Sequence, residues 1–298
     1  MLSAVERKIE QYVAELGEPE VLRLYEKLPH GKRLRAKLIL RIAGSDLRVI
    51  KTAAIVEMIH AASLLHDDVI DDAFTRRKQP SINALYGNKT AIMFGDILYS
   101  KGFFELNDID RRVSQTISNA VTQLSLGELE DVSLSKCFNL DKEVYLEMIY
   151  QKTASLIEAS AEAAALLAGK PTASYRTYGK NLGLAFQMID DLLDITSDAE
   201  TLGKPALHDF VEGKTTLPYI YLYESLADED QVRLRALHAK KLSKEEQKWI
   251  MAGMEEHQII QKCYLEAKIL IDEAIALMNE AGETELSEIA REMIDRNF

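Results

Sequence analysis

The sequence predicts an all-α fold, and three observations support this prediction. Its six prolines leave long proline-free tracts. Within these tracts apolar residues recur at spacings of three and four, as expected for one face of a helix. The clearest example is the set Ile50, Ala53, Ala54, Met58, Ala61, Ala62 and Leu65. Strand signals are nearly absent, because no run alternates apolar and polar residues for long and no Asn-Gly or Asp-Gly turn separates β-branched runs.

The same spacing defines the helices in chain order. Prolines 19 and 29 bracket the second helix, and Pro80 and Pro171 each precede another. Gly169-Lys170-Pro171 and the stretch 202–213 are the strongest breakers. The predicted helices cover 4–16, 20–28, 33–43, 47–72, 81–87, 90–107, 110–135, 141–168, 172–198 and 215–227, with several more after 230. No low-complexity linker divides the chain, so we expect a single domain over residues 1–298. From 228 onward no cluster indicates chemistry, and we expect packing and surface there.

The composition is that of a globular chain whose acidic charge excludes several partners. With 47% hydrophobic and 28% charged residues, the chain is neither disordered nor fibrous. Its net charge of −12 disfavours a general attraction to nucleic acid or anionic lipid and favours cation binding. Apolar stretches such as 163–168 are too short to cross a bilayer, so we expect no transmembrane segment. The N-terminus lacks the apolar core of a signal peptide, and the two cysteines show no metal-ligand spacing, which fits a reducing cytoplasm.

Four aspartates interrupt the apolar helix predicted over 47–72. Asp67 and Asp71 lie one turn apart on nearly the same face, and Asp68 and Asp72 repeat that relation on the adjoining face. Like charges about 6 Å apart repel by roughly 3 kcal/mol at an effective dielectric of about 20, so the cluster needs cations or basic groups nearby. The simpler alternative for this segment alone is a solvated acidic helix face.

The same arrangement occurs a second time, at Asp190, Asp191 and Asp194 in the helix predicted over 172–198. Two all-oxygen carboxylate clusters on apolar helices suit hard divalent ions. Mg²⁺ usually completes its coordination shell with water and phosphate oxygens. We therefore expect Mg²⁺, with Mn²⁺ as a substitute, and a diphosphate that bridges the two clusters.

Basic residues occur where such a substrate would need them. They are Lys32, Arg33 and Arg35 after Gly31, then Arg76 and Arg77, and finally Lys152, Lys204 and Lys214 near glycine or small residues. Guanidinium groups offer paired donors to phosphate oxygens, so the arginines indicate a second diphosphate site that needs no metal. His60 lies two helical turns before Asp67 on much the same face. Taken alone, a histidine of this kind is more often a packing residue.

Together these segments resemble the trans-isoprenyl diphosphate synthases of the polyprenyl synthetase family. The resemblance covers residues 28–225 and depends on the joint order and spacing of its motifs. These are GKRLR at 31–35, EMIHAASLLHDDVIDDAFTRR at 57–77, QKTASL at 151–156, GLAFQMIDDLLD at 183–194, GKP at 203–205 and GKTTLP at 213–218. The resemblance implies a helical bundle of the isoprenoid synthase type with a central substrate cavity, and it favours a homodimer.

The resemblance also implies a function and the residues that perform it. The chain would be a chain-elongating prenyltransferase that joins isopentenyl diphosphate to an allylic diphosphate primer. The implied Mg²⁺ ligands are Asp67, Asp68, Asp71, Asp190, Asp191 and Asp194. The implied contacts of the allylic substrate are Arg76, Lys152, Lys204 and Lys214, with Thr153 and Gln187 beside the reacting allyl group. The implied contacts of isopentenyl diphosphate are Lys32, Arg35, His60 and Arg77. The segment 127–131 lacks a glutamine common in the family, so we give it no catalytic role.

Small side chains before Asp67 bear on the length of the product. A tail that starts at the acidic motif would run along this helix towards its N-terminus, past Ser63 and Ala62. No Phe, Tyr or Trp occurs between Tyr25 and Phe74, so this helix supplies no early aromatic floor. With the resemblance to long-chain members, this predicts an all-trans product of seven to nine isoprene units, with octaprenyl as the central expectation. The alternative is that the small residues only permit close helix packing.

Other functions stay open at this point. A metal phosphohydrolase of the histidine-aspartate type would use His66 as a ligand, but it leaves the second acidic motif unexplained. A terpene cyclase or head-to-head condensing enzyme would have no need of the isopentenyl site. A shorter-chain synthase, making geranylgeranyl or farnesyl diphosphate, would share every motif. A non-catalytic subunit would have little reason to retain both acidic motifs and the basic residues.

Overall fold

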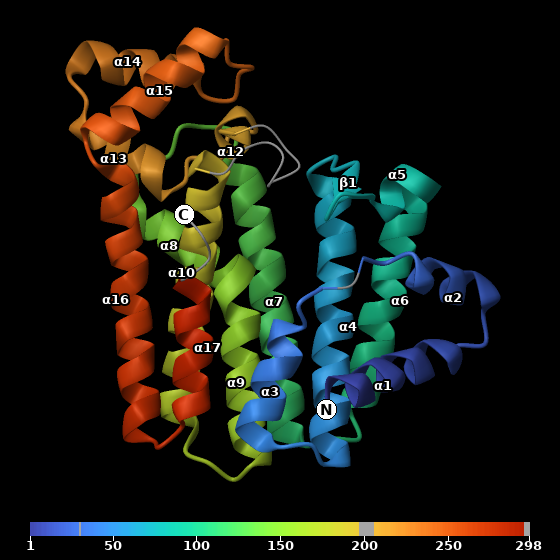
Figure 1. The fold of residues 1–298 in the computed structure, drawn as a ribbon. Helices are drawn as coiled ribbons and strands as arrows, with labels where there is room; N and C mark the ends of the chain where they lie inside the picture. The colour runs from blue at the N-terminus through green and yellow to red at the C-terminus, as the bar shows by residue number, and fades with distance from the viewer. Residues whose placement is uncertain (30, 197–205, 295–298) are drawn as a thin grey trace. The chain divides into compact units, whose positions relative to one another are not determined.

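The computed structural model describes residues 1–29, 31–196 and 206–294 and confirms the all-α fold (Figure 1). The chain divides into two compact units. Unit 1 consists of Met1–Val121 and Glu158–Arg176, and unit 2 consists of Thr122–Ile157 together with the chain from Thr177 onward. The single domain and its central cavity stay predictions.

The elements follow the predicted order. Unit 1 contains α1 (Leu2–Ala14), α2 (Pro19–Glu26), α3 (Leu34–Ala43), α4 (Leu47–Ile70), β1 (Thr75–Arg76), β2 (Gln79–Pro80), α5 (Ile82–Tyr86) and α6 (Asn88–Leu106). Three helices have residues in both units: α7 (Arg111–Leu134), α9 (Ser155–Leu167) and α10 (Thr172–Thr196). Unit 2 contains α8 (Lys142–Ile149), the π-helical turn η1 (Tyr150–Ala154), α12 (His208–Val211), α13 (Leu217–Ser225), α14 (Asp228–Leu237), α15 (Lys244–Glu256), α16 (Ile259–Glu280) and α17 (Thr284–Ile294).

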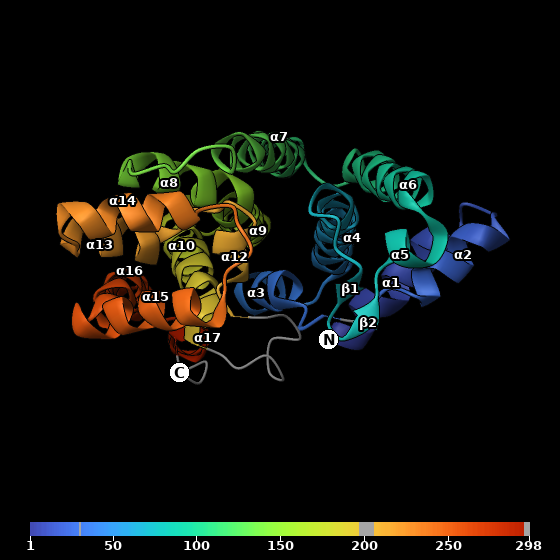
Figure 2. The same cartoon turned by 90° about the horizontal axis from the view of Figure 1, so that it is seen from above.

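Unit 1 is organised around α4, which packs against α1, α3 and α6 (Figure 2). Asp46 caps its N-terminus by accepting a hydrogen bond of 3.0 Å from the backbone N–H of Val49. Apolar side chains cover most of its surface, and Ile55 and Ile59 are fully buried. The first acidic motif therefore sits at the end of a helix that is fixed along its length.

By length and composition, α4 is also the one helix of the described residues that could cross a membrane. This corrects the expectation that every apolar stretch is too short. However, 61% of its most apolar window is buried inside the protein. A buried core helix of a soluble protein passes the same test, so this observation is weak evidence for a membrane span.

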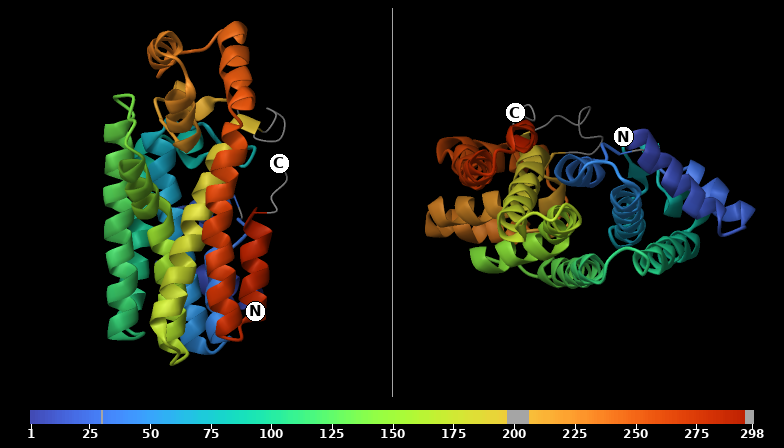
Figure 3. Two further views of the ribbon diagram at one scale, coloured as in Figure 1. Left: turned by 90° about the vertical axis from the view of Figure 1, so that its left-hand side faces the viewer. Right: turned by 90° about the horizontal axis from the view of Figure 1, so that it is seen from below.

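In unit 2, α13 contacts α14, α15 and α16, and α16 lies beside α17 (Figure 3). The backbone of η1 is approached closely by two glycines. A Cβ on Gly127 of α7 would lie 2.3 Å from the backbone nitrogen of Lys152, and a Cβ on Gly183 of α10 would lie 2.5 Å from the Cα of Ala154. Both glycines are therefore required by close helix contact.

Three local features differ from the sequence prediction. The helix predicted over 141–168 is interrupted by η1, where one turn of π-helix carries Lys152 and Thr153. Residues 75–80 form a short antiparallel hairpin whose turn residues, Arg77 and Lys78, have φ values of 54° and 63°. Neither is Gly, Asn or Asp, so the usual hairpin signal is missing. The short helix α12 lies within the stretch that we predicted to be a breaker.

The close packing of η1 predicts that Gly183→Ala destabilises the protein. The added methyl group would overlap Ala154, and overpacking of this kind costs about 1–3 kcal/mol. The expected result is a lower urea midpoint with an unchanged slope.

Gly102→Ala in α6 is the matched control, because its Cβ would meet Ile59 and Ile55 only at 3.5 Å and beyond. This variant should keep or gain stability, since Ala is favoured over Gly in a helix by about 1 kcal/mol. A Gly183→Ala variant as stable as the control would contradict the packing described for η1.

Candidate active site

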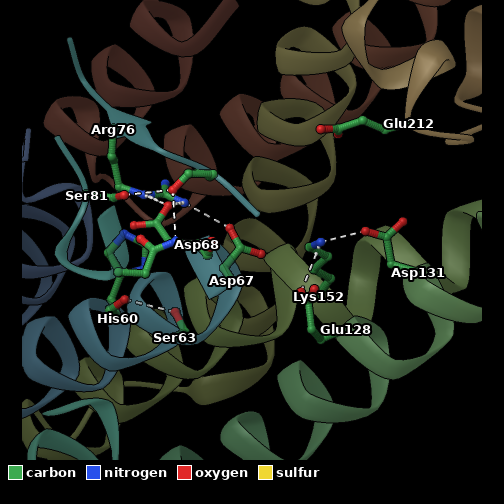
Figure 4. Close-up of polar contacts among 12 residues, drawn as sticks. His60, Ser63, Asp67, Asp68, Arg76, Ser81, Glu128, Asp131, Lys152 and Glu212 are labelled. Atoms are coloured by element: carbon green, nitrogen blue, oxygen red, sulfur yellow. Dashed lines mark hydrogen bonds and ion pairs between the residues drawn. The ribbon is translucent and has the colours of Figure 1, made fainter. Parts of the chain in front are cut away.

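The first acidic motif ends α4, with Asp71 as the residue that follows its last turn. The β1–β2 hairpin turns the chain back, so that Arg76 reaches this motif. The Arg76 Nη2 donates to Asp67 Oδ2 at 3.0 Å, and its Nε donates to Asp68 Oδ1 at 2.7 Å (Figure 4). One guanidinium group therefore pairs with two of the crowded carboxylates and offsets part of their charge.

Burial gives Asp68 a different character from Asp67. The Asp68 side chain is only 6% exposed, compared with 21% for Asp67. Burial raises the pKa of Asp68, and Arg76 acts in the opposite direction by favouring the carboxylate. The basic neighbour that the acidic cluster requires is therefore Arg76.

Two polar side chains hold the hairpin against the end of α4. The buried Asn83 donates through Nδ2 to the carbonyl oxygen of Asp68 at 3.0 Å and to that of Ala73 at 3.1 Å. Ser81 Oγ donates to the same Ala73 carbonyl at 2.7 Å. These contacts tie the segment that leaves α4 to the residues that begin α5. The sequence analysis missed both residues, because neither lies in a recognised motif.

A group of arginines surrounds His60 in unit 1. Burial lowers the pKa of His60 well below its usual value, and the positive charges of Arg35, Arg77, Arg76 and Arg33 lower it further. His60 is therefore neutral at neutral pH. Burial also lowers the pKa of Arg35, to about 10, which leaves it charged. The structure thus brings together His60, Arg35 and Arg77, as the family resemblance implies.

The loop before α3 is fitted to this group. Arg77 Nη1 donates to the carbonyl oxygen of Pro29 at 3.1 Å, and the guanidinium lies where a Cβ on Gly31 would be. Lys32 is exposed on the same loop. His30, which precedes Gly31, lies outside the described residues.

Arg33 is a residue whose role the sequence analysis did not assign. It has a left-handed backbone, with φ of 51°, at the start of α3. Its guanidinium donates to both carboxylate oxygens of Glu6, at 2.7 and 3.0 Å, and to Glu57 at 3.4 Å. The buried Glu57 also accepts a bond of 2.9 Å from the backbone N–H of Ala36. Arg33 is therefore committed to holding the loop, which leaves Arg35 and Arg77 for a ligand.

The second acidic motif, in α10 of unit 2, is held by neutral donors. The Tyr145 hydroxyl donates to Asp191 Oδ2 at 2.6 Å, and Gln187 Nε2 donates to Asp191 Oδ1 at 2.9 Å. Thr153 Oγ1 in turn donates to Gln187 Oε1 at 2.8 Å. This chain of bonds fixes which end of the Gln187 amide faces Thr153. The sequence analysis named Thr153 and Gln187 but missed Tyr145.

Burial dominates the electrostatics of this motif. It raises the pKa of Asp191 to about 8, with Asp209 and Asp190 acting in the same direction and the bonds from Tyr145 and Gln187 opposing. Asp194 is also buried, and its Oδ2 accepts a bond of 3.1 Å from the backbone N–H of Asp209. Asp190 is half-buried. The three aspartates of this motif therefore have different surroundings.

Two lysines lie beside the carboxylates of α7 and of Glu212, the residue that follows α12. Lys152 Nζ lies 2.6 Å from Asp131 Oδ2 and 3.0 Å from Glu128 Oε2 (Figure 4). Lys214 Nζ lies 3.5 Å from Glu212 Oε2 and 3.9 Å from Asp131 Oδ2. Unit 2 therefore brings together two of the three predicted diphosphate lysines. The third, Lys204, lies outside the described residues together with the rest of GKP at 203–205.

The segment 127–131 thus has a role that the sequence analysis did not give it. Glu128 and Asp131 are three residues apart on α7 and face the same lysine. The three-residue spacing of these two acidic residues puts them on one helix face, and this is the sequence signal that could have indicated a shared basic partner.

The donor chemistry of both motifs fits Mg²⁺, because carboxylate oxygens are its preferred protein ligands. Within the described residues, however, no three His, Cys, Asp or Glu side chains are already gathered closely enough to hold an ion. Asp67 and Asp68 instead face Arg76, and Asp191 faces Tyr145 and Gln187. The role of the six aspartates as metal ligands stays a prediction.

His66 packs against α6. Its Nε2 lies 3.2 Å from the carbonyl oxygen of Ile92 and 3.4 Å from Asp96, and its ring lies 5.6 Å from that of Tyr99. These contacts give His66 a packing role against α6. They argue against the phosphohydrolase alternative, which would use His66 as a metal ligand.

Comparisons with known proteins identify the family and the fold of the chain. Residues 19–254 match the model of a family described as Polyprenyl synthetase. A short chain isoprenyl diphosphate synthase of Methanothermobacter thermautotrophicus is 34% identical over 77% of this chain and 75% of its own length. Heptaprenyl diphosphate synthase component 2 of Geobacillus stearothermophilus is 32% identical over 98% of this chain and 93% of its own length. The crystal structure of octaprenyl pyrophosphate synthase from Helicobacter pylori has 43% identity and a TM-score of 0.94, covering 99% of this chain and 98% of that one.

The bond from Tyr145 to Asp191 predicts that Tyr145→Phe weakens ligand binding. The variant leaves a buried carboxylate with one donor fewer, which costs about 1–2 kcal/mol of stability. It should also reduce the rise in melting temperature that Mg²⁺ with inorganic diphosphate produces, because Asp191 and Gln187 lose their fixed orientation.

Tyr178→Phe is the matched control in the same unit. The Tyr178 hydroxyl is also buried and donates to the carbonyl oxygen of Leu286 at 2.9 Å. Loss of this hydroxyl should lower stability by a similar amount and leave unchanged the rise in melting temperature that Mg²⁺ with inorganic diphosphate produces. An equal rise in both variants would remove Tyr145 from the binding site.

Proposed function

Because the chain belongs to the polyprenyl synthetase family of prenyltransferases, we propose that it condenses isopentenyl diphosphate with an allylic diphosphate to give a long-chain all-trans polyprenyl diphosphate. The observation that carries this proposal is the group of arginines around His60. In a chain of net charge −12, this local positive charge supports a diphosphate site that needs no metal. A cyclase, which takes one diphosphate, has no use for that second site.

Isopentenyl diphosphate would bind through Arg35, Arg77, His60 and the exposed Lys32. The two guanidinium groups supply charge and paired donors to phosphate oxygens. Neutral His60 can donate a hydrogen bond without adding to the repulsion among the arginines. Arg33 and Glu57 keep the loop in place, so little ordering is required when the ligand binds.

The allylic diphosphate would bind at the acidic motifs with Arg76, Lys152, Lys204 and Lys214. Lys152 and Lys214 are already held beside Asp131. Negative charge that develops on the leaving oxygen would therefore meet cations in fixed positions, which is the arrangement that lowers a transition-state barrier most. Thr153 and Gln187 would lie beside the reacting allyl group, with the Gln187 amide oriented by Thr153 and Asp191.

The acidic motifs would hold Mg²⁺ through Asp67, Asp68, Asp71, Asp190, Asp191 and Asp194. When bound, Mg²⁺ supplies Lewis-acid stabilisation of the departing diphosphate. The proton that is lost after the new carbon–carbon bond forms would be accepted by the departing diphosphate, since the aspartates serve as ligands.

The proposed product spans heptaprenyl to nonaprenyl, with octaprenyl at its centre. Relatives bear names that range from short-chain to nonaprenyl synthases, so the support for a long product comes from α4. Ser63 is half-buried one turn before Asp67, and its hydroxyl donates to the carbonyl oxygen of His60 at 2.9 Å. A geranylgeranyl or farnesyl product remains the alternative.

The proposed assembly is a homodimer in the cytoplasm. α5 and α6 of unit 1 expose large apolar side chains, namely Leu85 (48%), Met93 (57%) and Phe104 (68%), which a second copy would cover. Both cysteines are free thiols, as expected in a reducing compartment. The heptaprenyl relative is named as one component of its enzyme, so a heteromer is the alternative. Light scattering of the purified chain distinguishes the two.

The proposed function predicts that the purified chain alone elongates allylic primers with isopentenyl diphosphate and Mg²⁺. Excess chelator should abolish turnover. Asp67→Asn should lower kcat by about a hundredfold, because the metal contact that Asp67 supports strengthens as charge develops on the leaving group. The measurement is the size and rate of formation of radiolabelled products.

The matched control is Asp72→Asn, at the exposed neighbouring aspartate whose left-handed backbone Asn tolerates well. It should keep kcat. Elongation in excess chelator would overturn the metal proposal, and a chain that elongates only after a partner is added would favour the subunit alternative.

Product length is tested by Ser63→Phe, which should shorten the product and leave the first condensation largely intact. Ala62 is a poorer test site, because it is fully buried. It lies midway between Ile59, which packs at Gly102 of α6, and His66, which also packs on α6. Ala62→Phe would therefore strain the α4–α6 contact. Ser45→Phe, at an exposed loop residue, is the control for Ser63→Phe. An unchanged product from a folded Ser63→Phe variant would show that the tail does not pass this face.

A further inference from the structure

The turn that carries Lys214 is pressed against the end of α7. Gly213 has φ of +90°, and a Cβ there would lie 2.4 Å from the carbonyl oxygen of Ser135. The Lys214 backbone N–H donates to the carbonyl oxygen of Asp209 at 2.8 Å. Only glycine can occupy this position, so the turn has one well-defined path past Ser135.

His238, the residue that follows α14, closes the other side of this turn. Its Nε2 lies 2.7 Å from the carbonyl oxygen of Gly213 and 3.1 Å from Thr215 Oγ1. A carbonyl oxygen can only accept, so Nε2 carries a hydrogen and donates it to Gly213. The imidazole N–H therefore donates to Gly213, just before Lys214, and the same nitrogen lies close to Thr215, just after it.

Aromatic neighbours hold the His238 ring in this position. It makes edge contacts with Phe138, at 5.2 Å between ring centroids, and with Phe210, at 5.6 Å. The backbone N–H of Ala239 donates to the carbonyl oxygen of Phe210 at 3.2 Å. The orientation of the ring is thus set by packing as well as by its hydrogen bonds.

We propose that His238 is a positioning residue for Lys214: it fixes the Gly213–Thr215 turn, and through it the place of the Lys214 ammonium beside Asp131. This inference depends on the proposed role of Lys214 in holding the allylic diphosphate. Lys214 Nζ shares Asp131 with Lys152, at 3.9 and 2.6 Å, so a shift of the turn would separate the two cations. A region that the sequence analysis assigned to packing would then set the geometry of the diphosphate site.

The test compares His238→Phe, which keeps an aromatic ring but removes the donor, with His238→Gln, which restores an N–H. In His238→Phe we expect kcat/KM for the allylic substrate to fall about tenfold and KM for isopentenyl diphosphate to stay unchanged, since a small misplacement of a binding group has effects of this size or more. His238→Gln should recover part of the loss. His257→Phe, at a half-buried histidine after α15, is the control and should behave as wild type.

A double-mutant cycle separates positioning from general destabilisation. In a Lys214→Ala background His238→Phe should have little further effect on kcat/KM, because the group that it positions is gone. An undiminished effect in that background, or full activity of His238→Phe, would overturn the proposal.

Hydrogen exchange of the Lys214 backbone N–H gives a readout that needs no turnover. It should be faster in His238→Phe than in the wild type and in His257→Phe. Unchanged exchange would overturn the role of His238 even in an active enzyme. If exchange is faster in His238→Phe but the wild-type chain has no prenyltransferase activity, the contact between His238 and the turn is supported and the proposed function is refuted instead.

Discussion

Crowded carboxylates on apolar helices are the constraint from which most of the site geometry follows. A buried carboxyl group is tolerated only when a cation or several hydrogen-bonding groups face it. Asp68 has Arg76, Asp131 has Lys152, and Asp191 has Tyr145 and Gln187. The residues that satisfy these carboxylates are largely those expected to contact substrate. The contacts that stabilise the folded acidic motifs therefore also place the groups expected to bind substrate.

Backbone departures from regular helix occur where these partners are placed. The β1–β2 hairpin uses left-handed Arg77 and Lys78, and it thereby directs Arg76 towards α4. The π-helical turn η1 adds a residue to one helical turn and so changes the direction of Lys152 and Thr153. Such conformations cost about 1–3 kcal/mol at non-glycine residues, so tertiary contacts must hold them. Asn83 and the glycines beside η1 are among those contacts.

Local pattern was sufficient for the helices and insufficient for their interruptions. Three- and four-residue spacing located both ends of α4 and the start of α10 to within two residues, because it reports burial of one helix face. The last residues predicted for α10, 197 and 198, lie outside the described residues. It could not reveal η1, which depends on the approach of Gly127 and Gly183 from other helices. The resemblance groups His60, Arg35 and Arg77 as contacts of one ligand; both arginines act electrostatically on His60, and their role in binding stays a prediction. Tyr145, Asn83 and His238 were missed because each acts on a residue distant in sequence, and no spacing rule records such contacts.

The two Asp-Asp-x-x-Asp motifs have the same letters and unlike environments. The first ends a helix, so Asp71 lies beyond its last turn and a charged arginine pairs with Asp67 and Asp68. The second lies inside α10, where neutral groups and a backbone N–H hold Asp191 and Asp194. Asp67 and Arg76 keep part of their side chains exposed, whereas Asp191 and its partner Tyr145 are buried. The two motifs therefore differ in how their carboxyl groups are stabilised: the first by a charged partner, the second by neutral hydrogen-bond donors.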